Sequence, residues 1–264
     1  MPIITVKQGN LEYLTAGSIA VPHCFTTRFG GVSTGHLESL NIGLHRGDDP
    51  SNVVKNHEIL AKAIGFDTEK LVLTHQVHSD IIRCVTADDA QGIDHHLYPE
   101  CDALITKDPG TALMVFTADC TPILLHDPVT GAVGAVHAGW RGTAADIAGK
   151  TVRAMAEAFG CKPSDICAAI GPNIGPCCFE TDAEVPDAMR ETFGTAAVQW
   201  IRPAGSKYYV NLKRINALAL YNAGVQKCEI STDCTMCSHE KYWSHRFTRG
   251  QRGSQGAIIV CKEG

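Results

Sequence analysis

Residues 111–138 read "TALMVFTADCTPILLHDPVTGAVGAVHA", a stretch rich in strand signals. Three short apolar runs occupy 111–118, 122–127 and 132–138. Runs of this length between turn signals are typical of buried strands. Because "DPVTG" between the last two runs is a strong turn signal, residues 122–138 are predicted to form a β-hairpin.

The region after this hairpin contains the clearest helix signal in the chain, over 143–159. Ile147, Val152, Met155 and Phe159 fall on one stripe, and Gly160 follows as a stop. Further helices are predicted at 51–64 (capped by Ser51), 182–194 and 211–224. Further strands are predicted at 3–9, 20–28, 70–85 (bent near Ser79), 101–106, 166–171 and 256–261.

The order of these elements indicates the fold class. A regular βα alternation is absent, and no glycine-rich phosphate loop follows a strand, which argues against Rossmann and P-loop proteins. Clustered strands with irregularly placed helices are typical of an α+β fold with a largely antiparallel or mixed sheet. No repeat or low-complexity linker divides the chain, so residues 1–264 are predicted to form a single domain.

Composition excludes several classes of protein. The 264 residues carry a formal net charge of −5 without any block of like charge, so a nucleic-acid partner is not expected. The first ten residues lack the features of an export signal, and no apolar run approaches the ~20 residues that span a bilayer. A cytoplasmic protein, monomeric by default, is therefore expected. In that reducing compartment most of its twelve cysteines are small core residues rather than disulfide partners.

The two histidines in "LVLTHQVHSD" (residues 71–80) would lie on opposite faces of an extended chain. Alternation places His75 on the apolar face, as a core histidine, and His78 on the polar face, where it is free to bind a ligand. His95, His96 and His126 are predicted to be loop or surface residues.

The hairpin region supplies a cysteine and a second histidine. Cys120 follows Asp119 at a predicted strand end, and a neighbouring carboxylate raises a thiol pKa unless a cation or metal lies close. His137 ends the run "AVGAVHA", just before "AGWRG" and the strong helix, where Arg141 and the helix N-terminus suit an anion such as phosphate. The basic stretch "HRFTRGQR" at 245–252 is interpreted as a loop or a small anion site.

His78, Cys120 and His137 together offer two imidazoles and one thiolate. This set matches a zinc site with three protein ligands and an open fourth position. The alternative is that these three residues lie near strand ends by chance and bind no metal. A non-enzymatic protein with a structural metal is the less favoured alternative, because structural zinc sites usually have four protein ligands.

The remaining cysteine motifs are weaker signals. Cys234 and Cys237 form a CxxC with His239 behind it, but no second pair accompanies them, so a plain turn is favoured over a structural zinc site. Cys177 and Cys178 are adjacent, and in an extended chain they point apart and cannot both face one site.

Seven motifs in order resemble one known family: "TTRFGGVS", "LNIGLHRGDD", "HQVHSD", "TADCTPILLHD", "GAVGAVHAGWRGT", "AIGPNIGPCCFE" and "YWSHRFTRGQRGSQGAIIV". From about Arg28 to Val260 the chain resembles the YfiH/YlmD-type laccase-domain (polyphenol oxidase) family, now described as purine nucleoside phosphorylases. The sequence departs from the family where "RGQRGSQG" replaces a common "TGR" and where "GPCCFE" has cysteine in place of a frequent tyrosine.

The resemblance implies a fold, a metal and an activity. The implied fold is α+β, with mixed sheets packed as a sandwich and helices outside. The implied zinc ligands are His78, Cys120 and His137. The implied reactions are phosphorolysis of adenosine, inosine, guanosine and methylthioadenosine, and deamination of adenosine.

A chemical interpretation of these reactions suggests roles for four further residues. Arg28, Asn41 and Arg141 are expected to bind phosphate or the nucleoside. Asp119 is expected to hold a ligand histidine or the base in place.

Two rival chemistries stay open. A cysteine and two histidines also form a blue-copper ligand set, and copper can displace zinc adventitiously, but the chain has none of the paired HxH runs that a multicopper laccase needs. In a metal-free hydrolase, His137 would activate Cys120 as a nucleophile, a mechanism that gives His78 no role.

Overall fold

The predicted hairpin lies at the centre of one of two large sheets. In the computed structural model, which describes residues 3–262, β8 (Thr121–His126) pairs antiparallel with β9 (Val133–Ala138), and every residue of both strands is buried. Asp127 accepts a hydrogen bond from the Val129 N–H (2.8 Å) in the connecting turn, and Gly131 supplies the left-handed conformation (φ 79°) that closes it. The hairpin prediction is confirmed.

Fifteen strands form three sheets in the described part of the chain. The first sheet has the order β1-β2-β3-β15-β7-β4, the second β14-β10-β8-β9-β6-β5, and a small third sheet β11-β13-β12. Besides β8 and β9, the strands are β1 (Ile4–Gln8), β2 (Leu11–Thr15), β3 (His23–Thr26), β4 (Leu71–Leu73), β5 (Ile82–Cys84), β6 (Ala103–Thr106), β7 (Ala112–Thr117), β10 (Cys167–Ile170), β11 (Glu180–Thr181), β12 (Ile201–Ala204), β13 (Lys207–Val210), β14 (Lys227–Ile230) and β15 (Gln255–Val260).

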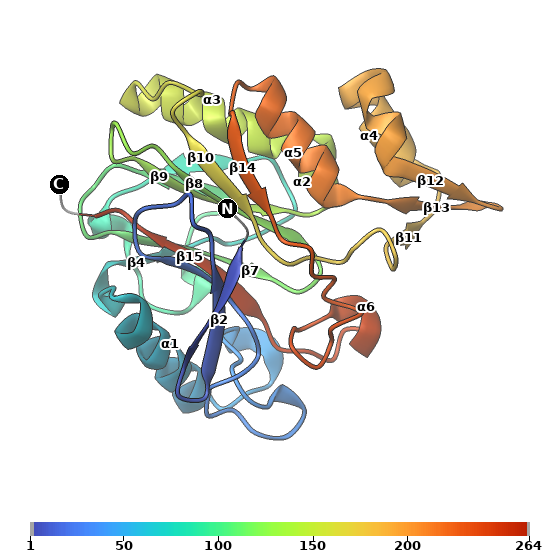
Figure 1. Ribbon diagram of the computed structural model, residues 1–264. Helices are drawn as coiled ribbons and strands as arrows, with labels where there is room; N and C mark the ends of the chain where they lie inside the picture. The colour runs from blue at the N-terminus through green and yellow to red at the C-terminus, as the bar shows by residue number, and fades with distance from the viewer. Residues whose placement is uncertain (1–2, 263–264) are drawn as a thin grey trace.

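The two large sheets pack face to face, and helices cover their outer sides (Figure 1). Within β8, Leu124 belongs to the core between the sheets, whereas Ile123 and Leu125 belong to the core under the helices. This alternation explains why β8 reads as a continuous apolar run: both of its faces are buried. The sheets contain parallel and antiparallel pairs, and the predicted α+β fold is confirmed.

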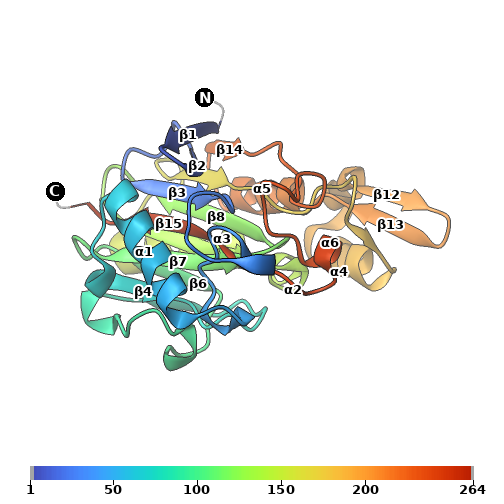
Figure 2. The ribbon, with the colours of Figure 1, turned by 90° about the horizontal axis from the view of Figure 1, so that it is seen from below.

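The helices lie on two sides of the sandwich. α3 (Ile147–Phe159) and α5 (Leu212–Asn222) cover the second sheet, and α1 (Pro50–Ile64) lies against the first sheet on the opposite side (Figure 1). α4 (Glu184–Phe193) and the small sheet extend to one side of the molecule, which Figure 2 shows from below. Two short helices complete the set, α2 (Trp140–Ala144) and α6 (His245–Thr248).

Four predicted elements differ from the structure. The helix at 143–159 is two helices, because Asp146 adopts a left-handed conformation (φ 59°) between α2 and α3. The cap of α1 is Asp49, whose side chain accepts from the Ser51 N–H, with Pro50 in the first turn. The first strand pairs with β2, a strand the sequence did not indicate. The strand at 70–85 is β4 and β5 separated by a loop that contains His78.

One observation bears on membranes. Within residues 3–262 the helices are too short or too polar to cross a bilayer.

Candidate active site

Three side chains from separate segments meet at one end of the sandwich. His137 lies in β9 opposite Pro122 of β8, and this register places it beside Cys120, which directly precedes β8. His78 reaches them from the loop after β4, with its Nε2 atom 3.9 Å from the Cys120 Sγ atom. One ligand atom from each of the three residues lies within 4.8 Å of the others. The structure therefore brings together the three residues proposed as metal ligands.

Asp102, a residue that the sequence analysis did not single out, holds two of these side chains. Its carboxylate is fully buried and accepts a hydrogen bond from His137 Nδ1 (2.7 Å), which leaves the other ring nitrogen of His137 free. It also accepts from the backbone N–H groups of Val77, His78 and Ser79, at 2.7 to 3.2 Å. These bonds fix the loop in which His78 has a left-handed conformation, φ 60°. Asp102 thus orients one ligand directly and the other through its backbone.

Strong electrostatic coupling links the three groups. Burial alone raises the pKa of Cys120, but the neighbouring His137 and His78 outweigh it and lower that pKa to about 6. Burial lowers the pKa of His137, but Cys120 and Asp102 outweigh it and raise that pKa to about 9. Burial likewise raises the pKa of Asp102, yet its hydrogen bonds to His137 and Ser79 bring it down to about 2. The site therefore favours a thiolate, the form in which cysteine binds metals.

The geometry fits a zinc ion. Zn–S and Zn–N bonds of about 2.3 and 2.0 Å at a tetrahedral angle put sulfur and nitrogen about 3.6 Å apart, close to the observed 3.9 Å between His78 and Cys120. The buried carboxylate on the far nitrogen of His137 is the usual support of a zinc-bound histidine. Two imidazoles and one thiolate leave the fourth position open.

A pocket opens beside the three ligands. Its walls come from the loop before α1, from the ends of β4 and β7 and from the start of β15. The residues that line it are Gly43, Arg46, Thr74, Gln76, His78, His95, Phe116, Thr117, Ala118, Cys120, His137, Arg252 and Ser254.

Two arginines give the pocket a positive charge. Burial and the nearby Arg46 together lower the pKa of Arg252 to about 10, so two cations share this wall. Arg252 Nη1 donates to Ser254 Oγ (2.9 Å), and Arg46 Nε donates to the same oxygen (3.3 Å). The Nε atom of Arg252 is buried and has no hydrogen-bond partner in the described part of the chain. Such a donor in a positive pocket suits an anion. Arg252 is the last residue of the basic stretch 245–252, which the sequence predicts to be a loop or a small anion site.

Two arginines singled out from the sequence lie elsewhere. Arg141 is exposed on α2, stacks over Trp140 and lines a different hollow with Glu180. Arg28 stacks over Trp243 and donates to the backbone oxygens of Glu38 and His239. Neither residue lines the pocket beside His78, Cys120 and His137.

Asn41 and Asp119 have supporting contacts. The buried Asn41 accepts from the N–H groups of Gly43 (3.0 Å) and Ser254 (2.9 Å), so it joins two segments that line the pocket without lining it itself. Asp119 accepts from Thr235 Oγ1 and from the Arg246 N–H, both at 2.6 Å. The carboxylate that contacts His137 is Asp102, whereas Asp119 contacts the segment after β14.

The structure contradicts the predictions for His126, Cys177 and Cys178, whereas His95 and His96 lie in a loop as predicted, in the short turn His95–Leu97. His126 is buried within β8, because both faces of that strand are covered. His95 is half-buried and forms part of the pocket wall, with its ring 5.4 Å from that of Phe116. Cys177 and Cys178 both approach Cys237, since they lie in a turn rather than in an extended segment.

Comparison with known proteins agrees with this architecture over almost the whole chain. Residues 22–262 match the family model described as "Multi-copper polyphenol oxidoreductase laccase". A relative from Geobacillus stearothermophilus, named purine nucleoside phosphorylase YlmD, is 40% identical over 254 residues, which cover 94% of this chain and 92% of the relative. A relative from Escherichia coli, named purine nucleoside phosphorylase YfiH, is 34% identical over 226 residues, 86% of this chain and 88% of the relative.

Solved structures extend the likeness to three dimensions. The crystal structure of YlmD from Geobacillus stearothermophilus superposes with a TM-score of 0.93 at 38% identity, covering 99% of this chain and all of that one. A protein YfiH from Bacillus licheniformis gives the same TM-score at 33% identity, with 99% of each chain covered. A family model matched over residues 22–262 and relatives this similar along nearly the full length show that the chain belongs to the multi-copper polyphenol oxidoreductase laccase family.

Proposed function

We propose that this protein is a zinc-dependent purine nucleoside phosphorylase that acts on adenosine, inosine, guanosine and methylthioadenosine and also deaminates adenosine. The observation that carries the proposal is a three-ligand site, His78, Cys120 and His137, that shares one pocket with Arg46 and Arg252. The names of the relatives from Geobacillus stearothermophilus and Escherichia coli support the same activity. The whole chain is proposed to act as one catalytic domain and as a monomer.

His78, Cys120 and His137 would hold the zinc, and Asp102 would keep His137 in the tautomer that presents its free nitrogen. When bound, zinc supplies a Lewis acid that polarises a substrate oxygen or lowers the pKa of a water molecule. The open fourth position is the feature that separates such a catalytic site from a structural one.

Arg46 and Arg252 would bind the phosphate. In phosphorolysis a phosphate oxygen forms a bond to the anomeric carbon of the ribose, the bond from that carbon to the purine nitrogen breaks, and the base leaves with a proton. A guanidinium group can donate two parallel hydrogen bonds to two oxygens of one phosphate, and its charge offsets that of the phosphate. The Nε atom of Arg252, which has no hydrogen-bond partner among the described residues, is a donor available to a phosphate oxygen. Orienting the two reactants in one pocket contributes to the rate in addition to charge neutralisation.

The base would lie against the aromatic wall formed by Phe116 and His95. A purine ring stacks favourably on such side chains. Gln76 supports this wall, because its amide donates to the Phe116 carbonyl (2.8 Å) and accepts from the Phe116 N–H (2.7 Å).

A second candidate function rests on the charges of the metal-free site. With Cys120 near a pKa of about 6 and His137 near about 9, the pair would exist as thiolate and imidazolium, the arrangement of a cysteine hydrolase. His78 has no role in that chemistry. A copper-dependent polyphenol oxidation is the least supported reading, since copper at this ligand set is expected as an adventitious occupant.

Incubation of zinc-loaded protein with adenosine or inosine, with and without phosphate, tests the proposal. We expect phosphate-dependent release of free base with ribose-1-phosphate, and inosine formed from adenosine without phosphate. Removal of zinc by a chelator should abolish both reactions, and added zinc should restore them. A Cys120→Ser variant controls for contaminating enzymes and should be inactive. Full activity of the metal-free protein would instead favour the thiol mechanism.

A further inference from the structure

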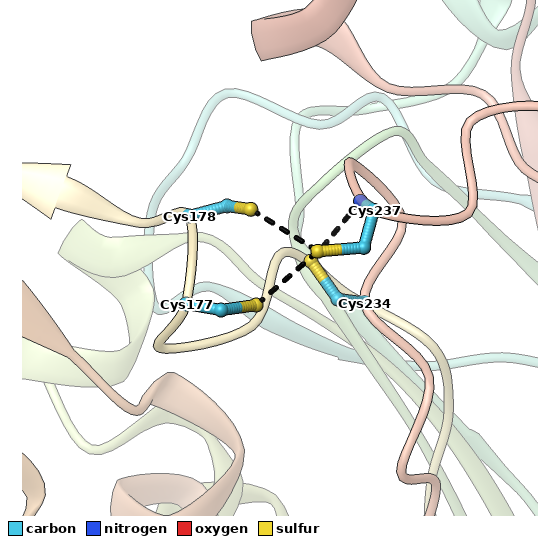
Figure 3. Close-up of side chains that lie close together, drawn as sticks. All are labelled: Cys177, Cys178, Cys234 and Cys237. Carbon is cyan, nitrogen blue, oxygen red and sulfur yellow. Dashed lines mark hydrogen bonds between the residues drawn. The ribbon is translucent and has the colours of Figure 1, made fainter.

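A second cluster of metal-ligand side chains lies away from the pocket. Cys177, Cys178, Cys234 and Cys237 come from two segments nearly sixty residues apart in sequence. Figure 3 shows the four sulfurs converging on one point, and all four lie within 4.8 Å of one another. We infer that these thiols form a tetrahedral site for one zinc ion, with a structural role, and this inference rests on no part of the proposed function.

Two tight turns produce the convergence. The N–H groups of Cys178 (3.0 Å) and Phe179 (2.9 Å) both donate to the Gly175 carbonyl, so the chain curls and its adjacent cysteines no longer point apart. The second segment has the Cys-x-x-Cys spacing that structural zinc sites use, and Ser238 N–H donates to the Cys234 carbonyl (2.9 Å) within it. Each turn thus contributes two ligands.

The sulfur distances suit one shared ion. Cys237 Sγ is 3.5 Å from Cys177 Sγ and 3.4 Å from Cys178 Sγ. Four sulfurs around one zinc with bonds of about 2.3 Å lie about 3.8 Å apart. A [4Fe–4S] cluster places each cysteine on a separate iron and a [2Fe–2S] cluster places two on each of two irons, so cysteine sulfurs on different irons lie further apart.

The surroundings of Cys234 favour a thiolate. Its Sγ atom accepts hydrogen bonds from the backbone N–H of Gly175 (3.1 Å) and of Cys237 (3.5 Å). The buried Lys213 donates to the carbonyls of Ser231 and Asp233 and lies close enough to Cys177 and Cys234 to interact with them electrostatically. A zinc ion with four thiolates has a net charge of −2, which a nearby ammonium partly offsets.

A side chain at position 175 would crowd the two turns where they meet. A Cβ atom there would come within 3.1 Å of Cys234 Cβ and 3.2 Å of Cys177 Sγ. His239, the other ligand type in this segment, lies outside the cluster and stacks on Phe247 with ring centroids 3.5 Å apart.

A metal bound here would join the segment after β10 to the segment after β14. The two segments already share a hydrogen bond from the Thr235 N–H to the Asn173 carbonyl (3.0 Å). Thr235 also donates to Asp119, the neighbour of Cys120. Four protein ligands close the coordination sphere, as in structural zinc sites, so the ion would stabilise the wall behind the pocket without taking part in the reaction.

The test is a zinc count on reduced protein in which the pocket ligands are removed by His78→Ala and Cys120→Ser. We expect one tightly bound zinc per chain, and an X-ray absorption spectrum with a sulfur-only shell at about 2.3 Å. Adding Cys177→Ser and Cys178→Ser should reduce the count to zero. Cys84→Ser, which removes an exposed cysteine on β5, is the matched control and should leave the count at one.

A measurement on the unsubstituted chain guards against misfolding of the variants. Cobalt added to this protein should give intense sulfur-to-cobalt charge-transfer bands, and their amplitude should fall by more than half in Cys177→Ser/Cys178→Ser, because four of its five expected cobalt–sulfur bonds would belong to the cluster. Absence of zinc from the reduced His78→Ala/Cys120→Ser protein, or nitrogen in its metal shell, would overturn the inference. Failure of the nucleoside assay would leave all these outcomes unchanged.

Discussion

At the residue scale, Asp102 determines how the pocket ligands are held. Its carboxylate, alone among those of residues 3–262, contacts both the ring of His137 and the backbone of the His78 loop. His78, Cys120 and His137 were proposed as metal ligands from residue type and from the family resemblance, and the structure brings their side chains together. Asp102 was not, because its significance depends on His137, which is 35 positions away in sequence and becomes its neighbour only when β6 pairs with β9.

Asp102→Asn should therefore weaken zinc binding about 10- to 100-fold, the usual effect of removing the carboxylate behind a ligand histidine. The amide cannot accept the bonds from His137 and from three backbone N–H groups as the carboxylate does. Competition with a metallochromic chelator measures the affinity. Asp119→Asn is the comparison, since that carboxylate contacts no ligand. A larger loss in Asp119→Asn than in Asp102→Asn would contradict the assignment.

Two arginines offer a second contrast at this scale. Arg252→Ala removes a guanidinium of the pocket wall and should raise the KM for phosphate at least about tenfold, in line with the loss of a charged hydrogen bond. Arg141→Ala removes an exposed arginine outside the pocket and should change that KM less than about twofold. Steady-state rates at varied phosphate concentration separate the two. Equal effects would show that phosphate does not bind where the structure places Arg252.

At the element scale, the sequence identified His78 through a strand that the structure does not contain. Alternation over residues 71–80 assumed an extended chain, whereas β4 ends at Leu73 and His78 lies in a loop with φ 60°. The strand is interrupted by hydrogen bonds to residues that are distant in sequence. The Gln76 side chain bonds to the backbone of Phe116 in β7, and the Asp102 carboxylate accepts from backbone N–H groups within residues 77–79. Hydrophobic periodicity is therefore a poor guide where a strand edge becomes a site.

The junction between β9 and α2 imposes a further requirement on this site. A Cβ atom on Gly139 would lie 2.8 Å from His78 Cδ2 and 3.5 Å from Cys120 Sγ. Gly139→Ala should displace the His78 ring and lower zinc affinity at least about tenfold, with thermal stability nearly unchanged because the backbone angles there (φ −66°, ψ 172°) are open to alanine. Isothermal titration with zinc and a melting curve measure both. Gly134→Ala in β9, with ordinary contacts of 3.4 Å, should keep the parent affinity.

At the scale of the whole molecule, the sandwich and its two layers of helices follow from the pattern of apolar runs. The run 122–125 is apolar throughout because Leu124 packs on the other sheet, whereas Ile123 and Leu125 pack under α3 and α5. The order of strands in each sheet was beyond the sequence, since β15 inserts between β3 and β7 through pairings of high sequence separation. The meeting of the four cysteines was missed for the same reason.

Because both faces of the large sheets are covered, several histidines are buried, and these histidines predict how the stability of the fold changes in acid. His23 accepts a hydrogen bond from the Ala16 N–H at Nε2 (2.8 Å) while Nδ1 donates to the Val21 carbonyl (2.8 Å), so its ring is neutral in the folded protein. Burial lowers the pKa of His23 and of the fully buried His57 below the ordinary value of 6.5. The unfolded chain therefore binds more protons than the folded chain between that value and the folded pKa.

The part of the unfolding free energy that depends on His23 and His57 being neutral should accordingly be fully present above about pH 6.5. It should decline as the pH falls below that value, by at most about 1.4 kcal/mol per pH unit for each histidine. Urea unfolding at pH 7, 6 and 5 measures the slope. His23→Gln retains an acceptor but cannot take up the proton, so its unfolding free energy should be lower at pH 7 and fall less steeply than that of the parent. His36→Gln, at an exposed position, should keep the parent slope. An unchanged slope in His23→Gln would show that protonation of this ring does not destabilise the sandwich.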